Sequence, residues 1–168
     1  MRAVLPLPPH SRGEKSRCIC DAIACIPQWV SARCVATFAP QEREPDVELL
    51  WAHSGGKRVA FPRVDGEGLG LFSVVSPLDL RPAQWGIREP LALVENRVWP
   101  AEVDVILVPG VAFTRGGLRC GRGGGFYDRL LAALPVSAWK IGVCFGEQLV
   151  EDVPTEPHDL GVDVVVFA

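Results

Sequence analysis

Residues 119–129 form a glycine-rich segment whose residue types and spacing suit the binding of a phosphate group. Their sequence is Arg-Cys-Gly-Arg-Gly-Gly-Gly-Phe-Tyr-Asp-Arg. Glycine adopts backbone angles that other residues avoid, so such a loop can turn several backbone N–H groups toward an anion. The segment leads into a predicted helix over residues 128–134, and the N-terminus of a helix favours negative charge. The spacing therefore indicates an anion site.

Three kinds of side chain in this segment extend the inference from an anion to a nucleotide. Arg119, Arg122 and Arg129 supply positive charge. Asp128 carries a carboxylate, which is a hard oxygen ligand for Mg²⁺. The aromatic pair before it offers a flat surface to a heterocyclic ring. Phosphate, metal and ring together indicate a nucleotide site.

The segment matches neither of two common phosphate-binding motifs, so an alternative remains. It lacks the Gly-Lys-Ser/Thr ending of a Walker A loop, and its glycines match a Rossmann fingerprint only loosely. The alternative is a glycine-rich hairpin or helix cap with surface arginines. The upstream residues 104–113, Asp-Val-Ile-Leu-Val-Pro-Gly-Val-Ala-Phe, are typical of a buried parallel strand that ends in a turn. Because ligands of open α/β sheets bind beyond such strand ends, this context favours a binding site.

Apolar runs that alternate with helical patterns predict the elements that position this segment. Strands are predicted over residues 33–38, 58–61, 69–75, 103–108, 140–145 and 162–167. Helices, the first capped by Ser16, are predicted over residues 16–29, 46–53 and 128–134. The alternation predicts an α/β fold with three layers, α/β/α, around a mostly parallel, Rossmann-like open sheet.

Length and proline content predict how the chain is divided. A chain of 168 residues is expected to form a single domain over residues 1–168. Residues 1–14 include three prolines and are expected to be partly disordered. Residues 77–100 are rich in proline and are expected to form a loop.

Composition narrows the class of partner. The net charge of −3 argues against general nucleic-acid binding, which favours a basic chain. No apolar run approaches the roughly 20 residues that a membrane helix needs. Prolines also interrupt the N-terminal segment where a signal peptide would lie. We expect a cytoplasmic monomer that binds neither nucleic acid nor a membrane.

The six cysteines include no Cys-x-x-Cys pair, so a zinc knuckle or a thioredoxin-like site is not expected. Cys34 and Cys144 fall in predicted strands and are expected to be small buried hydrophobic residues. Cys120 lies within the glycine segment. It is either structural or, beside three arginines, a reactive thiol.

Two segments carry a resemblance to a known family. Residues 108–113 and 117–129 resemble the signature of 5-formyltetrahydrofolate cyclo-ligase, also called 5,10-methenyltetrahydrofolate synthetase. Shorter matches follow in the family's order at residues 44–46, 57–62, 86–90, 145–148 and 154–159. The resemblance implies ATP-dependent cyclisation of 5-formyltetrahydrofolate, a small-molecule substrate, to 5,10-methenyltetrahydrofolate, with release of ADP and phosphate.

The resemblance also implies roles for individual residues, with ATP and Mg²⁺ as cofactors. The catalytic residues would be Arg119, Arg122 and Tyr127. These three would also bind the nucleotide, together with Arg2, Gly121, Gly123, Gly124, Gly125 and Phe126.

Five further residues have an implied role and a simpler alternative. Asp128 and Asp159 would hold the metal; alternatively, Asp128 is a charge at a helix N-terminus and Asp159 is a turn residue. Glu44 would contact the folate or be a solvated loop acid. Trp85 would pack on the folate ring or belong to a satellite core. Gln148 would contact the substrate or merely begin a helix.

The N-terminus departs from the family's pattern. Family members begin with a basic helix in which a lysine and an arginine reach the ATP phosphates. Here Arg2 alone can match that arginine, and residues 1–14 would be a remnant of this helix. Two alternatives follow. One is a weakly active or inactive relative that binds folate or nucleotide in a regulatory or other metabolic role. The other is an enzyme that uses the same scaffold on a different phosphorylated molecule.

Overall fold

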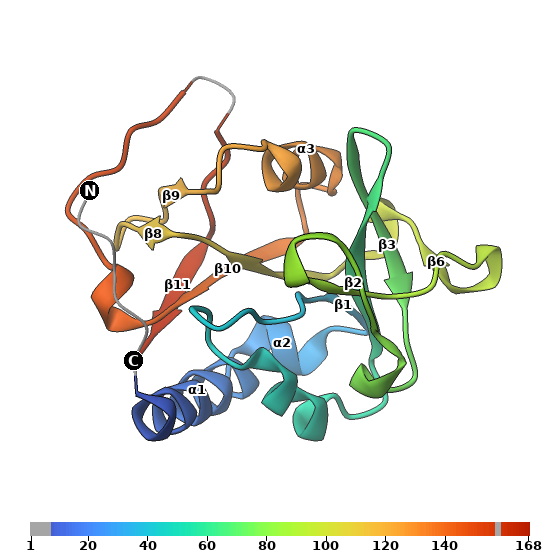
Figure 1. Cartoon of the computed structure of the whole chain (residues 1–168), viewed down its shortest axis with the longest axis horizontal. Helices are drawn as coiled ribbons and strands as arrows, with labels where there is room; N and C mark the ends of the chain where they lie inside the picture. Colours follow the sequence, from blue (N-terminus) through green and yellow to red (C-terminus); the bar gives the residue numbers. More distant parts are fainter. Residues whose placement is uncertain (1–7, 157–158) are drawn as a thin grey trace.

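The protein is built around a seven-stranded sheet, seen in a computed structural model that describes residues 8–156 and 159–168 (Figure 1). Arg2 therefore lies outside the described residues. In spatial order the strands are β11 (Val164–Phe167), β10 (Trp139–Cys144), β7 (Val105–Pro109), β1 (Cys34–Ala36), β2 (Arg58–Asp65), β3 (Gly68–Ser73) and β6 (Arg97–Val98).

The five strands from β11 to β2 are parallel, which confirms the prediction of a mostly parallel sheet. Val35 of the central strand β1 lies opposite Val59 of β2 and Val105 of β7. Strand β3 runs antiparallel to β2, because these two strands form a hairpin around a tight turn at Gly66. Strand β6 in turn pairs antiparallel with β3. An antiparallel edge on a parallel sheet is common in α/β proteins.

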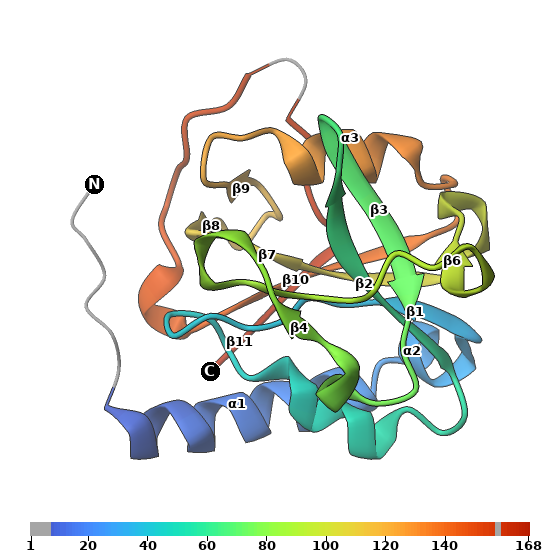
Figure 2. The same ribbon diagram turned by 45° about the vertical axis from the view of Figure 1, so that its right-hand side comes forward.

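Helices cover both faces of the sheet, as the predicted three-layer arrangement requires. One face carries α1 (Pro9–Ala24), α2 (Pro27–Ser31) and the 3₁₀ helix η1 (Val47–His53). The other carries α3 (Phe126–Ala133), and Figure 2 shows α1 and α3 on opposite sides of the sheet. No helix in the described part of the chain is long and apolar enough to cross a membrane.

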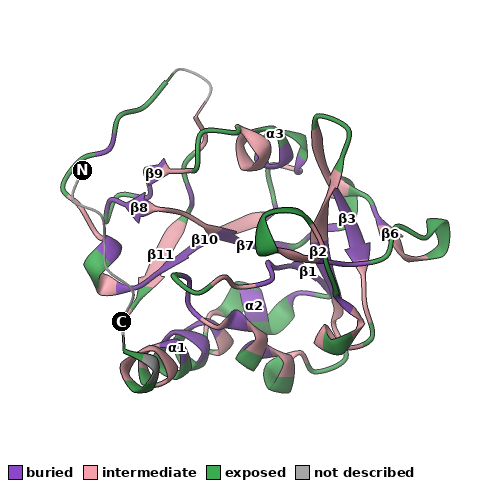
Figure 3. Ribbon diagram, viewed as in Figure 1, coloured by how far each residue is buried: buried purple, intermediate pink, exposed green. Residues whose placement is uncertain are grey.

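Alternating side chains of the central strands fill two cores, one on each face. In β7, Val105 and Leu107 pack toward α1, whereas Ile106 and Val108 pack toward α3. This follows from the two-residue period of a strand. Because both faces are covered, the strand is apolar throughout, and Figure 3 shows buried residues along β7 and β1. The predicted burial of Cys34 and Cys144 is confirmed.

The first helix begins seven residues earlier than predicted. It starts at Pro9 rather than after Ser16, so it includes part of the segment expected to be disordered. Proline is tolerated there because the first N–H groups of a helix have no partner within the helix. Ser16 is not a cap but a buried residue in mid-helix, where its hydroxyl accepts a hydrogen bond from the backbone of Asp46.

The proline-rich segment is more structured than a plain loop. Strands β4 (Arg81–Pro82) and β5 (Arg88–Glu89) form a short hairpin, and β6 joins the main sheet. Single 3₁₀ turns connect these strands; they are η2 (Pro77–Asp79), η3 (Gln84–Gly86), η4 (Val94–Asn96) and η5 (Pro100–Glu102).

Candidate active site

The order of the strands reverses next to β1. The chain leaves β1 toward β2 on one side and later returns to β7 on the other. The loops that follow β1 and β7 therefore leave the sheet in different directions at its carboxyl edge, and such a reversal of strand order is where open α/β sheets bind ligands. Residues 37–46 follow β1, and residues 110–125 follow β7. The predicted site residues Glu44 and Arg119 are thus brought to the same edge of the sheet.

The glycine-rich segment connects a small ribbon to α3. Strands β8 (Ala112–Phe113) and β9 (Arg119–Cys120) form the ribbon. Gly123 and Gly125 have φ angles of 85° and 62°, which favour glycine. A side chain at Gly121 would place its Cβ 2.8 Å from Nη1 of Arg119. The loop therefore brings bare backbone close to the arginine, as a phosphate cradle requires.

Helix α3 begins directly after this loop, and no side chain in the described part of the chain caps its N-terminus. The N–H groups of its first turn are therefore available to an external acceptor. Arg129, which was expected to add charge to this site, is directed elsewhere. Its Nη2 donates to the carbonyls of Glu67 and Gly124 at 2.6 and 3.0 Å, so it ties α3 to the β2–β3 turn.

Arg119 is buried at the centre of the site and pairs with Asp128. Its Nη2 lies 2.6 Å from Oδ1 of Asp128, and only 5% of the Arg119 side chain is exposed. The guanidinium also lies over the ring of Tyr127, 5.8 Å from its centroid. Its Nε is buried and has no hydrogen-bond partner among the described residues. A buried N–H without an acceptor is costly, so this atom fits an anionic ligand.

Glu44 and Arg122 join the loop after β1 to the glycine loop. Nη2 of Arg122 lies 2.9 Å from Oε1 of Glu44, and Oε2 accepts a hydrogen bond from the backbone of Gln41 at 2.9 Å. Glu44 is buried, so it is not the solvated loop acid of the alternative interpretation. Arg122 is largely exposed, which leaves most of its guanidinium free to meet a ligand.

The partly buried hydroxyl of Tyr127 is less acidic than that of an ordinary tyrosine, because its pKa is raised. Burial raises the pKa of its hydroxyl above the usual range, and the nearby negative charge of Glu44 adds to this effect. Arg119 acts in the opposite direction but more weakly. The phenol therefore stays protonated at neutral pH.

Gln148 lies at the same edge, in the 3₁₀ helix η6 (Gly146–Gln148) after β10. Its amide nitrogen donates to the carbonyls of Gly110 and Val111 at 2.9 and 3.3 Å, and its oxygen accepts from the backbone of Phe145 at 2.8 Å. Gln148 thus clamps the end of β10 to the turn after β7. Direct contact with the substrate stays a prediction.

Trp85 stands at the tip of the β4–β5 hairpin and is 69% exposed, so it does not belong to a satellite core. Its φ of 58° is unusual for a residue other than glycine. Such a conformation costs about 1–3 kcal/mol and is found where function benefits from it. A large exposed ring held in this way is available to stack on a ligand.

The two predicted metal ligands are in different surroundings. Asp128 faces Arg119, as described above, and is 16% exposed. Oδ2 of Asp159 accepts a hydrogen bond from the backbone of Glu156 at 2.7 Å. The following segment docks near the site, because the N–H of Val162 donates to the carbonyl of Gly117 at 2.9 Å. Within residues 8–156 and 159–168, no group of three His, Cys, Asp or Glu side chains could hold a metal.

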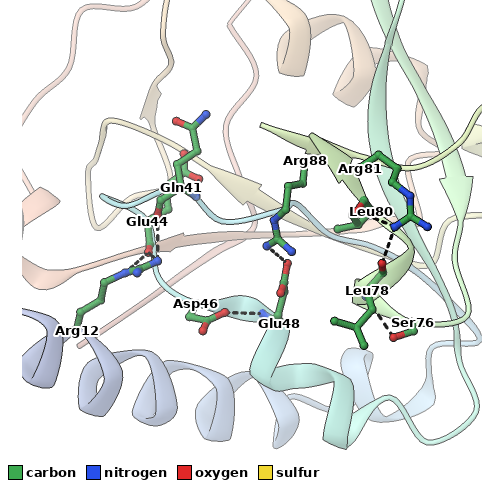
Figure 4. A network of polar contacts seen from close by, with 10 residues as sticks. All are labelled: Arg12, Gln41, Glu44, Asp46, Glu48, Ser76, Leu78, Leu80, Arg81 and Arg88. Carbon is green, nitrogen blue, oxygen red and sulfur yellow. Dashed lines mark hydrogen bonds and ion pairs between the residues drawn. The ribbon is translucent and has the colours of Figure 1, made fainter. Parts of the chain in front are cut away.

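Two arginines that no sequence motif indicated support the loops of the site. Arg12 of α1 donates to the backbone of residues 41 and 44. Arg88 of β5 pairs with Glu48 of η1 and so holds the base of the Trp85 hairpin (Figure 4). For Arg12, the only signal in the sequence is its four-residue spacing from Ser16 and Cys20. That signal can be recognised only if the helix is known to begin before Arg12.

A model of the 5-formyltetrahydrofolate cyclo-ligase family matches residues 6–168. The chain belongs to this family. The 5-formyltetrahydrofolate cyclo-ligase of Mycolicibacterium smegmatis is 37% identical over 144 residues, which cover 82% of this chain and 74% of the relative. That of Escherichia coli K12 is 33% identical over 168 residues, which cover 95% and 91%.

A solved structure shows the same likeness in three dimensions. The NMR structure of 5,10-methenyltetrahydrofolate synthetase from Aquifex aeolicus matches with a TM-score of 0.83 and 34% identity, over 96% of this chain and 81% of that one. Membership in the cyclo-ligase family thus rests on sequence and on fold.

Proposed function

We propose that this chain is an ATP-dependent cyclo-ligase that converts 5-formyltetrahydrofolate to 5,10-methenyltetrahydrofolate, with release of ADP and phosphate. The observation that carries the proposal is the state of the Arg119 guanidinium. This buried guanidinium has one N–H without an acceptor among the described residues, and it lies directly before the glycine loop at the strand-order reversal of a cyclo-ligase family fold. Such an atom suits a phosphate oxygen.

The reaction has to remove an oxygen that is a poor leaving group. In the proposed sequence the formyl oxygen bonds to the γ-phosphorus of ATP as the bond to ADP breaks. N10 then bonds to the formyl carbon and loses its proton, while the carbon–oxygen bond breaks and phosphate leaves. No covalent bond to the protein is formed. Catalysis therefore depends on position and on neutralisation of charge.

The glycine loop and its neighbours supply both requirements. Backbone N–H groups of residues 121–125 and of the first turn of α3 are proposed to bind the phosphates. Arg119 and Arg122 neutralise the charge that develops during transfer. The protonated hydroxyl of Tyr127 donates a further hydrogen bond, and the ring of Phe126 borders the nucleotide.

Asp128 is proposed to hold Mg²⁺, with Asp159 as a second ligand. Mg²⁺ usually takes one or two carboxylates together with substrate phosphates, which suits a chain whose described residues form no cluster of three or more ligating side chains. When bound, the ion would neutralise phosphate oxygens. Because Asp128 is paired with Arg119, a phosphate that attracts Arg119 also releases the carboxylate. We therefore expect Mg²⁺ to bind more tightly in the presence of nucleotide.

Glu44 and Trp85 are proposed to bind the folate. The carboxylate of Glu44 accepts hydrogen bonds from the pterin, and the exposed ring of Trp85 covers its face. Gln148 is proposed to border the same substrate. The cytoplasmic location, the monomeric state and the lack of nucleic-acid and membrane partners stay predictions from the sequence.

The test is an absorbance assay for the methenyl product with purified protein, 5-formyltetrahydrofolate, Mg²⁺ and ATP. We expect product that depends on ATP and is lost in Asp128→Asn. Asp21→Asn is the matched control, since Asp21 is an exposed acid on α1. Absence of product from the wild-type protein, with folate still bound in a titration, would indicate an inactive folate-binding relative.

A further inference from the structure

One side of α1 follows the chain segment that leaves β1. Arg12, Ser16 and Cys20 are spaced four residues apart, so they lie on one side of the helix. The hydroxyl of Ser16 accepts from the N–H of Asp46 at 2.9 Å, and the thiol of Cys20 donates weakly to the carbonyl of Asp46 at 3.5 Å. Arg12 contacts the earlier part of the same segment.

The guanidinium of Arg12 bridges two carbonyl groups of that segment (Figure 4). Its Nε and Nη2 donate to the carbonyl of Glu44 at 3.2 and 3.1 Å. The same Nη2 donates to the carbonyl of Gln41 at 3.1 Å. The planar fork of an arginine suits this arrangement, and a lysine could not reproduce it.

Residues 41–44 form a tight turn that Arg12 fixes to the helix. The N–H of Glu44 donates to the carbonyl of Gln41 at 3.0 Å, and the N–H of Gln41 donates to Oε2 of Glu44 at 2.9 Å. One carboxylate oxygen is thus held by the turn itself, and the other faces Arg122 of the glycine loop. Any movement of the turn would therefore move the carboxylate.

Other residues already dock α1 on the sheet. Ile19 and Ile23 are fully buried in the core beneath the helix, and Ser16 is buried beside them. Arg12 lies only three residues after the start of the helix and is half-buried. Its removal should therefore change the position of the turn more than the stability of the protein.

We propose that Arg12 is a positioning residue. It holds the turn at residues 41–44 so that the Glu44 carboxylate faces the glycine loop, and it thereby sets the affinity for the folate substrate without taking part in the chemical step. The role in affinity rests on the proposed function.

Steady-state kinetics test this role in Arg12→Gln and in the matched control Arg17→Gln. Arg17 lies on the same helix and is exposed, so the control removes the same charge. We expect Arg12→Gln to raise KM for 5-formyltetrahydrofolate roughly tenfold or more, since small misplacements in a site are costly. The turnover number and KM for ATP should change less than about twofold, because transition-state contacts remain. An unchanged KM for the folate would overturn the proposal.

A double-mutant cycle shows whether Arg12 acts through Glu44. If it does, Arg12→Gln should have little further effect on KM in a Glu44→Gln background, because the effects of coupled residues do not add. An equally large increase in that background would contradict the proposal, since Arg12 would then act by another route.

Amide hydrogen exchange separates this proposal from the proposed function. Without any ligand, residues 41–46 should exchange faster in Arg12→Gln than in wild type or Arg17→Gln, while the core strands stay protected. If the wild type forms no methenyl product, the cyclo-ligase function fails, but exchange still decides the positioning role. Unchanged exchange at residues 41–46 would refute it.

Discussion

At the scale of single residues, the site contains two pairs of opposite charges. Arg119 pairs with Asp128, and Arg122 pairs with Glu44. These pairs reduce the cost of keeping ionised groups in partly buried positions. Under the proposed function, a phosphate would take the place of an acidic partner and a metal ion that of a basic partner.

Arg119→Lys tests whether the shape of this cation matters as well as its charge. A lysine keeps the charge but loses the planar fork that reaches Asp128 with one nitrogen and leaves another for a phosphate. We expect kcat/KM for ATP to fall by roughly 10²–10³, as for loss of a buried donor to a transition state. The control is Arg33→Lys, because Arg33 is exposed. Its kcat/KM for ATP should equal that of the wild type.

The cysteines are expected to divide into two reactivity classes. Burial raises the pKa of Cys20 and Cys144 to about 12 and that of Cys34 to about 11. Since the thiolate is the reactive form, these three should resist iodoacetamide at pH 8 in the folded protein. The exposed Cys18 and Cys25 should be alkylated. Peptide mass spectrometry would check this, and rapid alkylation of Cys144 would contradict it.

At the scale of elements, two glycines make room for one ring. Phe113 of β8 is fully buried between Gly110 and Gly142. A Cβ on either glycine would lie 2.6 Å from an atom of the ring, which is closer than carbon atoms can approach. This packing fixes the ribbon that carries Arg119 to the centre of the sheet. The precision of the site thus depends on a contact that lies outside it.

Two glycine-to-alanine changes should have effects of opposite sign. Gly142→Ala would force the Phe113 ring to move, and we expect a loss of roughly 1–3 kcal/mol of unfolding free energy. Gly13→Ala adds a methyl group to α1 where, apart from the helix itself, no atom of the described residues lies within 4 Å. It should stabilise the protein by about 0.5–1 kcal/mol, because alanine is the better helix former. Urea denaturation of both variants would measure these changes. If the unfolding free energy changes in the same direction in both variants, this account is wrong.

Also at the scale of elements, the predicted start of α1 was wrong. Three prolines led us to expect partial disorder over residues 1–14, yet Pro9 opens the helix, because a proline is compatible with the first turn. The buried strands were predicted well, since strands covered on both faces are apolar throughout. The composition of a short stretch is enough to recognise such a strand. The start of α1 depends instead on which of several nearby prolines occupies the first turn of the helix.

At the scale of the whole molecule, α1 connects two loops at the carboxyl edge of the sheet. Arg12 holds the loop after β1, and Lys15 pairs with Glu147 of η6, after β10, at 2.5 Å. Figure 2 shows α1 on one side of the sheet and α3 on the other. The two loops come from parts of the sequence that are separated by more than half of the chain.

The pair between α1 and η6 predicts a dependence of stability on pH. The hydrogen bond from Lys15 holds the pKa of Glu147 below its ordinary value. A carboxyl with a lowered pKa stabilises the fold above its unfolded pKa and loses this contribution as pH falls through its folded pKa. The difference in unfolding free energy between wild type and Lys15→Gln should therefore be constant above about pH 5 and should shrink toward pH 3. Urea titrations at several pH values would measure it, and a difference that grows at low pH would contradict the assignment.

The amino-acid sequence by itself determined the class of fold and the location of the glycine loop that is proposed to bind phosphate. Apolar runs and the glycines at residues 121–125 carry their meaning locally, because strand burial and left-handed backbone angles depend on the residue types at each position. The family resemblance lay in the same local motifs, and the comparisons confirmed it.

Only the tertiary structure decided which residues meet. Arg122 and Glu44 are 78 positions apart, and they pair because β1 and β7 are neighbours in the sheet. The order of the strands is set by how both faces of the sheet can be covered, and no short stretch of sequence contains that information. For the same reason Arg12 could not be assigned to the site until α1 was seen beside the turn that carries Glu44.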